Sequence, residues 1–149
     1  MKLEQLLSPD CTKCAVQGKS KKNILQQISA LAANKISSAN AKELLDSLSK
    51  REKLSSTGIG NGIAIPHGKI NNCESPVAVL LTTDKPVIFD AIDDKPVDIF
   101  FALFVPEDHC QQHLETLASV ARFFSTKQNS KKVRRCRNSA ELHQLVINN

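Results

Sequence analysis

The chain has 149 residues, of which 41% are hydrophobic, and its 20 Lys and Arg outnumber 15 Asp and Glu to give a net charge of +5. A chain of this length can bury one sizeable core, so we expect one domain that spans residues 1–149. The longest apolar run, residues 99–105, is too short to cross a bilayer, and the first residues lack the features of a signal peptide. We therefore expect a cytoplasmic protein without membrane insertion.

The cysteines are odd in number and lack the spacing of a disulfide framework, which is typical of free thiols in a reducing compartment. They are Cys11, Cys14, Cys73, Cys110 and Cys136. Cys11 and Cys14 form a CxxC pair, but no second pair stands at zinc-finger spacing and no thioredoxin-like helix start follows. We favour free thiols over a metal or redox site here.

Two helices are predicted in the N-terminal third of the chain. Ser20 is a suitable N-cap for the first, because the apolar residues that follow it recur at the three-and-four spacing of one buried stripe. This stripe consists of Ile24, Leu25, Ile28, Leu31 and Ala32. The second helix is expected to start after Ser37 or Ser38 and to end near Leu54, ahead of a Ser- and Gly-rich stretch.

A glycine-rich segment follows, in which residues 56–69 read STGIGNGIAIPHGK and hold four of the five glycines. The alternation of residues 63–65 predicts a short buried strand, which would place His67 at the exit of that strand. Further strands are predicted at residues 77–83 and 97–105, with a shorter one at 87–89 between them.

The C-terminal part of the chain is predicted to be helical. Beyond Pro106 the apolar spacing predicts a third helix, with Asp108 as a candidate N-cap and His113 in the first turns. Asn138 followed by Glu141 resembles a capping box and predicts a short final helix. Helices at both ends and strands in the middle indicate an α/β or α+β domain with helices packed on a sheet.

His67 is a candidate phosphoryl acceptor. Such a histidine presents one neutral ring nitrogen as nucleophile, and an imidazole pKa of about 6.5 makes the neutral form abundant near neutral pH. The glycines from Gly58 to Gly62 could bring backbone N–H groups close to an anion, and Pro66 would restrict how His67 is aimed. A glycine-rich turn around a structural histidine is the alternative, and composition leaves both open. Neither Walker A nor GxGxxG is present, which disfavours nucleotide binding.

Arg51 and His113 are candidate contacts for a phosphoryl group on His67, since one offers a planar fork of donors and the other a hydrogen-bond donor. Taken alone, each is more typical of an ordinary helix position. His109 and Cys110 lie four and three residues before His113, spacings that could pair metal ligands on a helix, but no third ligand is evident. The sequence therefore predicts no metal and no cofactor.

Basic residues cluster near the C-terminus and could meet an anionic partner. They are Lys131, Lys132, Arg134, Arg135 and Arg137. The chain has no Trp or Tyr on which bases could stack, so we expect no nucleic-acid partner and favour a solvated helix face.

A family resemblance is carried first by residues 51–69, which read REKLSSTGIGNGIAIPHGK. This stretch resembles the signature of the mannitol and fructose class of enzyme IIA domains of the bacterial phosphotransferase system (PTS EIIA type 2), especially its nitrogen-regulatory branch. Matching stretches at residues 20–32, 89–108 and 113–124 extend the resemblance over nearly the whole chain. It implies a single α/β domain with a central mixed sheet flanked by helices.

The resemblance also implies a phosphotransferase component that accepts phosphate from an HPr-like phosphocarrier protein (NPr). His67 matches the phosphorylated histidine, with phosphate expected on Nε2, and Arg51 and His113 match positions near it. A free-standing IIA without IIB or IIC portions implies regulation of transport or of nitrogen and potassium metabolism, with a potassium transporter or sensor kinase as target. The alternative is a purely regulatory binding module, which His phosphorylation switches without onward transfer.

Overall fold

The computed structural model describes residues 3–73 and 75–148. Six strands in this part of the chain form one mixed sheet in the order β1-β5-β6-β3-β2, with β4 also paired to β6. The strands are β1 (Thr12–Val16), β2 (Gly58–Gly60), β3 (Ile63–Ala64), β4 (His67–Ile70), β5 (Val77–Val87) and β6 (Val97–Pro106). The helices are α1 (Leu3–Leu6), α2 (Lys21–Ala33), α3 (Ala41–Glu52), α4 (Cys110–Ser125), α5 (Lys127–Arg134) and α6 (Ser139–Ile147).

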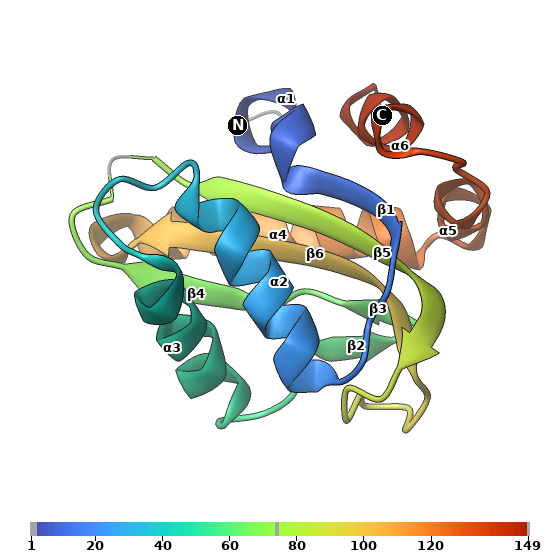
Figure 1. Cartoon of the computed structure of the whole chain (residues 1–149), viewed down its shortest axis with the longest axis horizontal. Helices are drawn as coiled ribbons and strands as arrows, with labels where there is room; N and C mark the ends of the chain where they lie inside the picture. The colour runs from blue at the N-terminus through green and yellow to red at the C-terminus, as the bar shows by residue number, and fades with distance from the viewer. Residues whose placement is uncertain (1–2, 74, 149) are drawn as a thin grey trace.

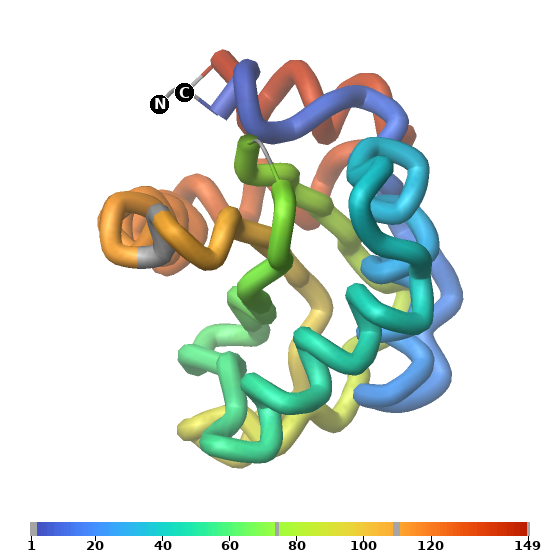
Figure 2. The backbone as a smooth tube through the Cα atoms, turned by 90° about the vertical axis from the view of Figure 1, so that its left-hand side faces the viewer, coloured from blue at the N-terminus to red at the C-terminus, as the bar shows by residue number. Residues whose placement is uncertain are grey.

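Helices cover both faces of the sheet (Figure 1). On one face α2 contacts β5 and α3 contacts β4, while α4 lies on the opposite face against β6 (Figure 2). α6 packs beside β1 and α1, and the Nε2–H of buried His143 donates to the Leu7 carbonyl at 2.9 Å. The two ends of the described chain are therefore fastened together. No helix in this part of the protein is long and apolar enough to span a membrane.

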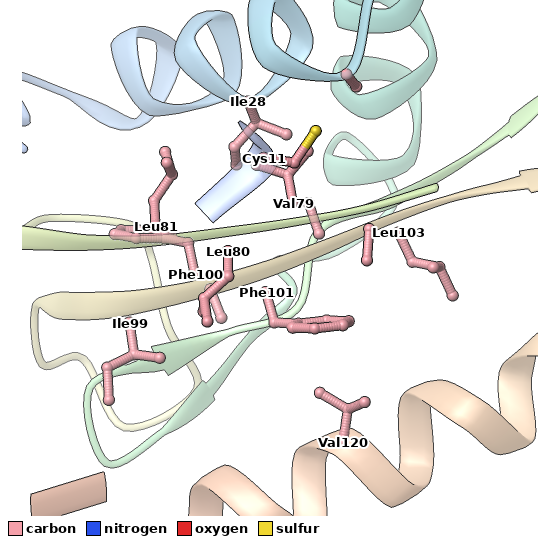
Figure 3. Packing of buried hydrophobic residues seen from close by; sticks show 14 of the residues in the cluster. Cys11, Ile28, Val79, Leu80, Leu81, Ile99, Phe100, Phe101, Leu103 and Val120 are labelled. Atoms are coloured by element: carbon pink, nitrogen blue, oxygen red, sulfur yellow. The ribbon is translucent and has the colours of Figure 1, made fainter. Parts of the chain in front are cut away.

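The core lies on both sides of the two central strands, β5 and β6, which pair antiparallel. Figure 3 shows Val79 of β5 beneath Ile28 of α2 on one face, and Phe101 of β6 above Val120 of α4 on the other. All four side chains are buried. Because β6 and the first half of β5 are covered on both faces, β6 and residues 77–81 of β5 are almost continuously apolar instead of alternating.

The structure confirms two of the helix starts that were predicted from capping residues. Ser20 accepts a hydrogen bond from the Asn23 N–H at the start of α2, and Asn138 accepts one from the Glu141 N–H at the start of α6. α4 carries His113 in its first turns, as expected, but it begins only at Cys110. The predicted N-cap Asp108 lies inside the preceding 3-10 turn, Glu107–His109, and does not cap α4.

Other boundaries differ from the predictions. The N-cap of α3 is Asn40, which forms a capping box with Glu43, and not Ser37 or Ser38, and α3 ends at Glu52. Asn40 caps the helix because its side-chain oxygen accepts the Glu43 N–H, while the Glu43 side chain accepts the Asn40 N–H. Residues 84–87 continue β5 past an irregularity, so Val87 ends that strand and starts no separate one.

Five helices or strands were not predicted as separate elements, namely α1, β1, β2, β4 and α5. β1 and α5 show why, because both depend on tertiary contacts. β1 is short and contains Cys14, the second cysteine of the CxxC pair. It is a strand because it pairs parallel with β5, which is distant in sequence. α5 carries much of the basic cluster, and only Ser130 and Val133 are buried on it. Lys131, Lys132 and Arg134 on α5 and Arg135 at its C-cap are exposed, which confirms the expected solvated face.

His67 stands in a broken strand. β3 pairs with β6 at Ile99 and Phe100, and β4 pairs with the same strand further along, from Leu103 to Pro106. Pro66 lies between the two short strands and has no N–H to donate, but its carbonyl accepts from the Leu103 N–H at 3.0 Å. His67 thus follows β3, as expected, and it is also the first residue of β4.

Candidate active site

The His67 ring has a different partner at each nitrogen. Nδ1 lies 3.0 Å from the Ile65 carbonyl oxygen, and Nε2 lies 3.3 Å from Nε of Arg51. A carbonyl only accepts and a guanidinium only donates, so Nδ1 carries the proton and Nε2 presents its lone pair. This is the tautomer in which Nε2 is a nucleophile.

Arg51 reaches His67 because α3 lies unusually close to β4. A side chain on Gly68 would meet Oγ of Ser47 and stand 3.1 Å from its Cβ and 3.3 Å from its backbone carbon, so the glycine allows this close approach. The Ser47 hydroxyl donates to the Lys69 carbonyl at 3.0 Å. Ser47 and Arg51 are one helical turn apart, so fixing the first over β4 places the second over His67.

Burial lowers the pKa of the His67 imidazole, and the nearby Arg51 guanidinium lowers it further, while the Ile65 carbonyl and the Glu52 carboxylate oppose these effects. The net direction is downward from 6.5. His67 is therefore neutral at physiological pH, with its nucleophilic lone pair available.

His67 and Arg51 line an open groove of about 770 Å³ between α3, β4 and the start of α4. The charged side chains that line it are Glu43, Asp46, Lys50, Arg51, Lys69 and Glu107. Two leucines lie at its margins, with Leu54 exposed to 81% and Leu114 to 43%. A groove with balanced charge and exposed apolar edges is suited to another protein's surface.

His113 is buried on α4, directly before Leu114. Since Leu114 lines the groove, the structure brings the backbone of this part of α4 to the groove that holds His67 and Arg51. Of the three predicted site residues, the direct contact described above joins Arg51 and His67.

The predicted anion cradle at Gly58–Gly62 is wrong. None of these glycines lines the groove; a side chain on Gly58 would meet Ala91, and one on Gly62 would meet Arg134 and Asp98. Gly60, Asn61 and Gly62 all adopt positive φ, because they form the tight turn between β2 and β3. The glycines serve this turn and its packing.

Side chains from elsewhere in the chain hold this turn. Arg134 donates to both carboxylate oxygens of Asp98 at 2.9–3.1 Å and to the Asn61 carbonyl at 2.8 Å. Asp93 accepts from the N–H groups of Lys95 and Asn61, which lower the pKa of its carboxyl group. Arg134 is exposed, as predicted for the basic cluster, and it also ties α5 to the turn between β2 and β3.

The cysteines of the CxxC pair have separate partners. The Cys11 thiol donates to the Leu31 carbonyl, and the Cys14 thiol donates to the Cys136 carbonyl at 3.2 Å. Burial raises the pKa of the Cys136 thiol, which makes it less reactive. All three are free thiols, as predicted.

The spacing of His109, Cys110 and His113 raised a metal pair as an alternative. The side chains of His109 and Cys110 lie outside the described residues. Among the side chains that the structure does describe, no three His, Cys, Asp or Glu residues gather to hold a metal ion.

The fold and the site together define an α/β protein with a neutral, groove-facing histidine beside an arginine. The family model "Phosphoenolpyruvate-dependent sugar phosphotransferase system, EIIA 2" matches residues 5–149. The chain therefore belongs to this EIIA family, which is a phosphotransferase component.

Individual proteins agree with the family match. The chain is 41% identical over 147 residues to the nitrogen regulatory protein of Pseudomonas aeruginosa, covering 99% of this chain and 96% of that protein. It superimposes on the crystal structure of IIA-Ntr from Neisseria meningitidis with a TM-score of 0.87 at 32% identity, covering 95% and 97% of the two chains. The mannitol IIA of Escherichia coli shares the fold, with a TM-score of 0.73 at 15% identity over 89% of this chain and 92% of that one.

Proposed function

We propose that the whole chain, residues 1–149, is a phosphohistidine carrier that accepts a phosphoryl group on Nε2 of His67. The observation that carries this proposal is the hydrogen bond from Nδ1 to the Ile65 carbonyl, which leaves Nε2 unprotonated beside Arg51. A nucleophilic histidine needs one nitrogen held as a donor and the other free of its proton. Membership of the EIIA family supports the same chemistry.

The transfer needs no proton to leave His67. Nε2 attacks the phosphorus of a phosphohistidine on the donor; the new N–P bond forms as the donor's P–N bond breaks, and that electron pair returns to the donor imidazole. Nδ1 keeps its proton on the Ile65 carbonyl throughout. Arg51 releases Nε2 and donates instead to the phosphoryl oxygens, where its positive charge offsets the dianion. His113 is a further donor to that group.

The donor in this proposal is an HPr-like phosphocarrier protein (NPr), and the protein acts in the cytoplasm. The exposed Leu54 and Leu114 at the margins of the groove support a protein donor, because apolar contacts around the reacting atoms exclude water. Similarity to proteins called nitrogen regulatory proteins supports an output in regulation. Targets would be transport or sensor proteins of nitrogen and potassium metabolism.

The same exposed leucines favour a second candidate function. In it the unmodified groove binds a regulatory target, and phosphorylation of His67 ends that binding without onward transfer. A dianion placed between two apolar contacts would have to be desolvated, which weakens the complex. The two functions differ only in what happens after His67 is phosphorylated.

The test is intact-mass analysis after incubation with phosphoenolpyruvate, the general phosphotransferase enzyme and its small carrier, at alkaline pH because phosphohistidine is acid-labile. Wild type should gain one phosphoryl group, and His67→Gln should gain none. His143→Gln is the matched histidine control and should be phosphorylated like wild type. An unmodified wild type, with the same partners active on another acceptor, would overturn the carrier function.

A further inference from the structure

The residue next to Arg51 in the sequence is an acidic one that the groove does not use. Glu52 is the last residue of α3, and only 5% of its side chain is exposed. A buried carboxylate is costly unless several donors satisfy its oxygens. The partners of the Glu52 carboxylate therefore indicate its structural role.

Glu52 has donors from two different parts of the chain. The backbone N–H of Thr57 donates to its carboxylate oxygens at 3.2 Å, and the Thr57 hydroxyl donates to Oε1. Lys21, at the start of α2, forms an ion pair with Oε2 at 2.8 Å, and the same ammonium lies 4.6 Å from the centre of the Phe89 ring. The carboxylate thus fixes Thr57 in position and is itself fixed by α2.

Thr57 in turn holds Ile65, two residues before His67. Its carbonyl accepts the Ile65 N–H at 3.0 Å, and the Ile65 carbonyl accepts the Nδ1–H of His67 at 3.0 Å. Thr57 is buried, so no water replaces these bonds easily. A continuous series of hydrogen bonds therefore runs from Glu52 through Thr57 and Ile65 to the far nitrogen of the His67 ring.

We propose that Glu52 is a positioning residue for His67: by holding Thr57, it aims the Ile65 carbonyl at Nδ1 and so keeps Nε2 unprotonated and directed into the groove. Arg51 and Glu52 are adjacent in sequence and act on opposite nitrogens of one ring, Arg51 directly and Glu52 through the residues Thr57 and Ile65. This inference deepens the proposed function, on which its catalytic consequence rests.

The proposal assigns the role to the hydrogen-bond acceptors of Glu52 and not to its charge. Glu52→Gln keeps an oxygen for Thr57 while it removes the negative charge, and Glu52→Ala removes both. If the acceptor is what matters, glutamine should preserve the state of the His67 ring and alanine should not. If the residue is merely a buried partner for Lys21, both variants lose stability alike and the His67 ring is unaffected.

The direct measurement is nitrogen-15 NMR of the His67 ring, which distinguishes the Nδ1–H from the Nε2–H tautomer. Arg51 favours the same tautomer from the other side, so the comparison is made in the Arg51→Gln background. Glu52→Ala should reduce the ratio of Nδ1–H to Nε2–H about fivefold to tenfold, as expected for one ordered hydrogen bond. Glu52→Gln should change it less than about twofold, and the exposed control Glu4→Gln not at all. An unchanged ratio in folded Glu52→Ala overturns the proposal.

Thr57→Val provides a second variant in case Glu52→Ala does not fold. It removes the hydroxyl donor to Glu52 but keeps the backbone N–H and the carbonyl, so the tautomer ratio should shift in the same direction by a smaller factor. No shift in this variant overturns the proposal as well.

The consequence for phosphorylation is measured separately, in the protein with Arg51 intact. Per folded molecule, Glu52→Ala should accept the phosphoryl group about tenfold to a hundredfold more slowly, because small errors in aim are costly, and Glu52→Gln should recover most of the rate. Since the NMR ratio needs no phosphate donor, a wild type that is never phosphorylated would overturn the proposed function while the positioning role is still judged on the tautomer. An unchanged rate in Glu52→Ala overturns the catalytic consequence.

Discussion

Residues 56–69 form one continuous glycine-rich stretch in the sequence, but its two halves face different parts of the molecule. The first half, Gly58–Gly62, turns toward Asp93, Asp98 and Arg134, and its glycines permit a tight turn. The second half carries His67 and Gly68 into the groove beneath α3. A single glycine-rich stretch thus contains a turn that serves packing and a histidine that serves chemistry. The density of glycines alone does not distinguish the two parts.

This comparison predicts that changes in the second half or in the groove around it reduce activity, whereas changes in the first half or in the residues that hold its turn reduce stability. The largest effect after loss of His67 itself is expected at Arg51. Arg51→Gln removes the donor that stabilises the phosphoryl group and should slow phosphorylation of His67 about a hundredfold to a thousandfold. Intact-mass time courses with a phosphorylated carrier measure this rate.

The matched control for that change is Lys53→Gln, which removes a positive charge from the exposed end of α3 without touching the groove. Its rate should stay within about twofold of wild type. If Lys53→Gln slowed transfer as much as Arg51→Gln, general positive charge and not the contact with Nε2 would explain the effect.

A smaller effect is expected where α3 meets β4. Gly68→Ala forces its new methyl group against Ser47 and must lift α3, which separates Arg51 from His67. Transfer should slow about tenfold, with a loss of roughly 1–3 kcal/mol in the free energy of unfolding by urea denaturation.

Gly18→Ala is the glycine control, since its methyl group would meet the ends of the Val87 and Ile24 side chains, away from the groove. It should lose stability by a similar amount but keep its transfer rate per folded molecule. Equal loss of rate in both glycine variants would mean that destabilisation alone slows the reaction.

The first half is tested by Arg134→Ala. This change removes the bonds to Asp98 and Asn61 and should lower the free energy of unfolding by about 1–2 kcal/mol. The neighbouring exposed Arg135→Ala should cost less than about 0.5 kcal/mol. Both should be phosphorylated within about threefold of the wild-type rate; a larger loss in Arg134→Ala would show that the turn and the groove are coupled.

The sequence predicted the helices better than it predicted their contacts. Apolar spacing and capping residues are local signals, so Ser20 and Asn138 were recognised as N-caps and confirmed. β1 and α5 were not predicted, because their stability comes from neighbours distant in sequence. Asn40 was overlooked although Glu43 three residues later could have indicated its capping box.

The same distinction holds for the site. His67 and Arg51 were predicted from residue chemistry and family resemblance, and the structure brings the two into contact. The roles of Gly68 and Glu52 depend on how closely α3 approaches β4 and on what buries a carboxylate. Neither property has a local sequence signal, since Glu52 in the run REK is indistinguishable from a solvated helix residue.

The smallest predicted effect concerns pH and tests whether burial of His67 costs stability. Burial, and secondarily Arg51, keep the pKa of folded His67 below its ordinary value of 6.5, so the unfolded chain binds this proton more readily. The contribution of neutral His67 to the free energy of unfolding is therefore fully present above about pH 6.5, and it is lost as the pH falls toward the pKa of the folded protein. Urea denaturation of wild type and His67→Gln at several pH values isolates it, because other groups titrate alike in both proteins.

Wild type should therefore lose stability relative to His67→Gln on acidification below pH 6.5, and the acidic limb of the phosphorylation rate should lie below the same pH. Arg51→Gln removes one of the two lowering causes, so the acid-dependent loss should shrink in that background without vanishing, since burial is the larger cause. An opposite slope would mean that His67 is protonated in the folded protein. The lone pair of Nε2 would then be unavailable for phosphorylation. The second half of the glycine-rich stretch would therefore lack the chemistry that distinguishes it from the first half.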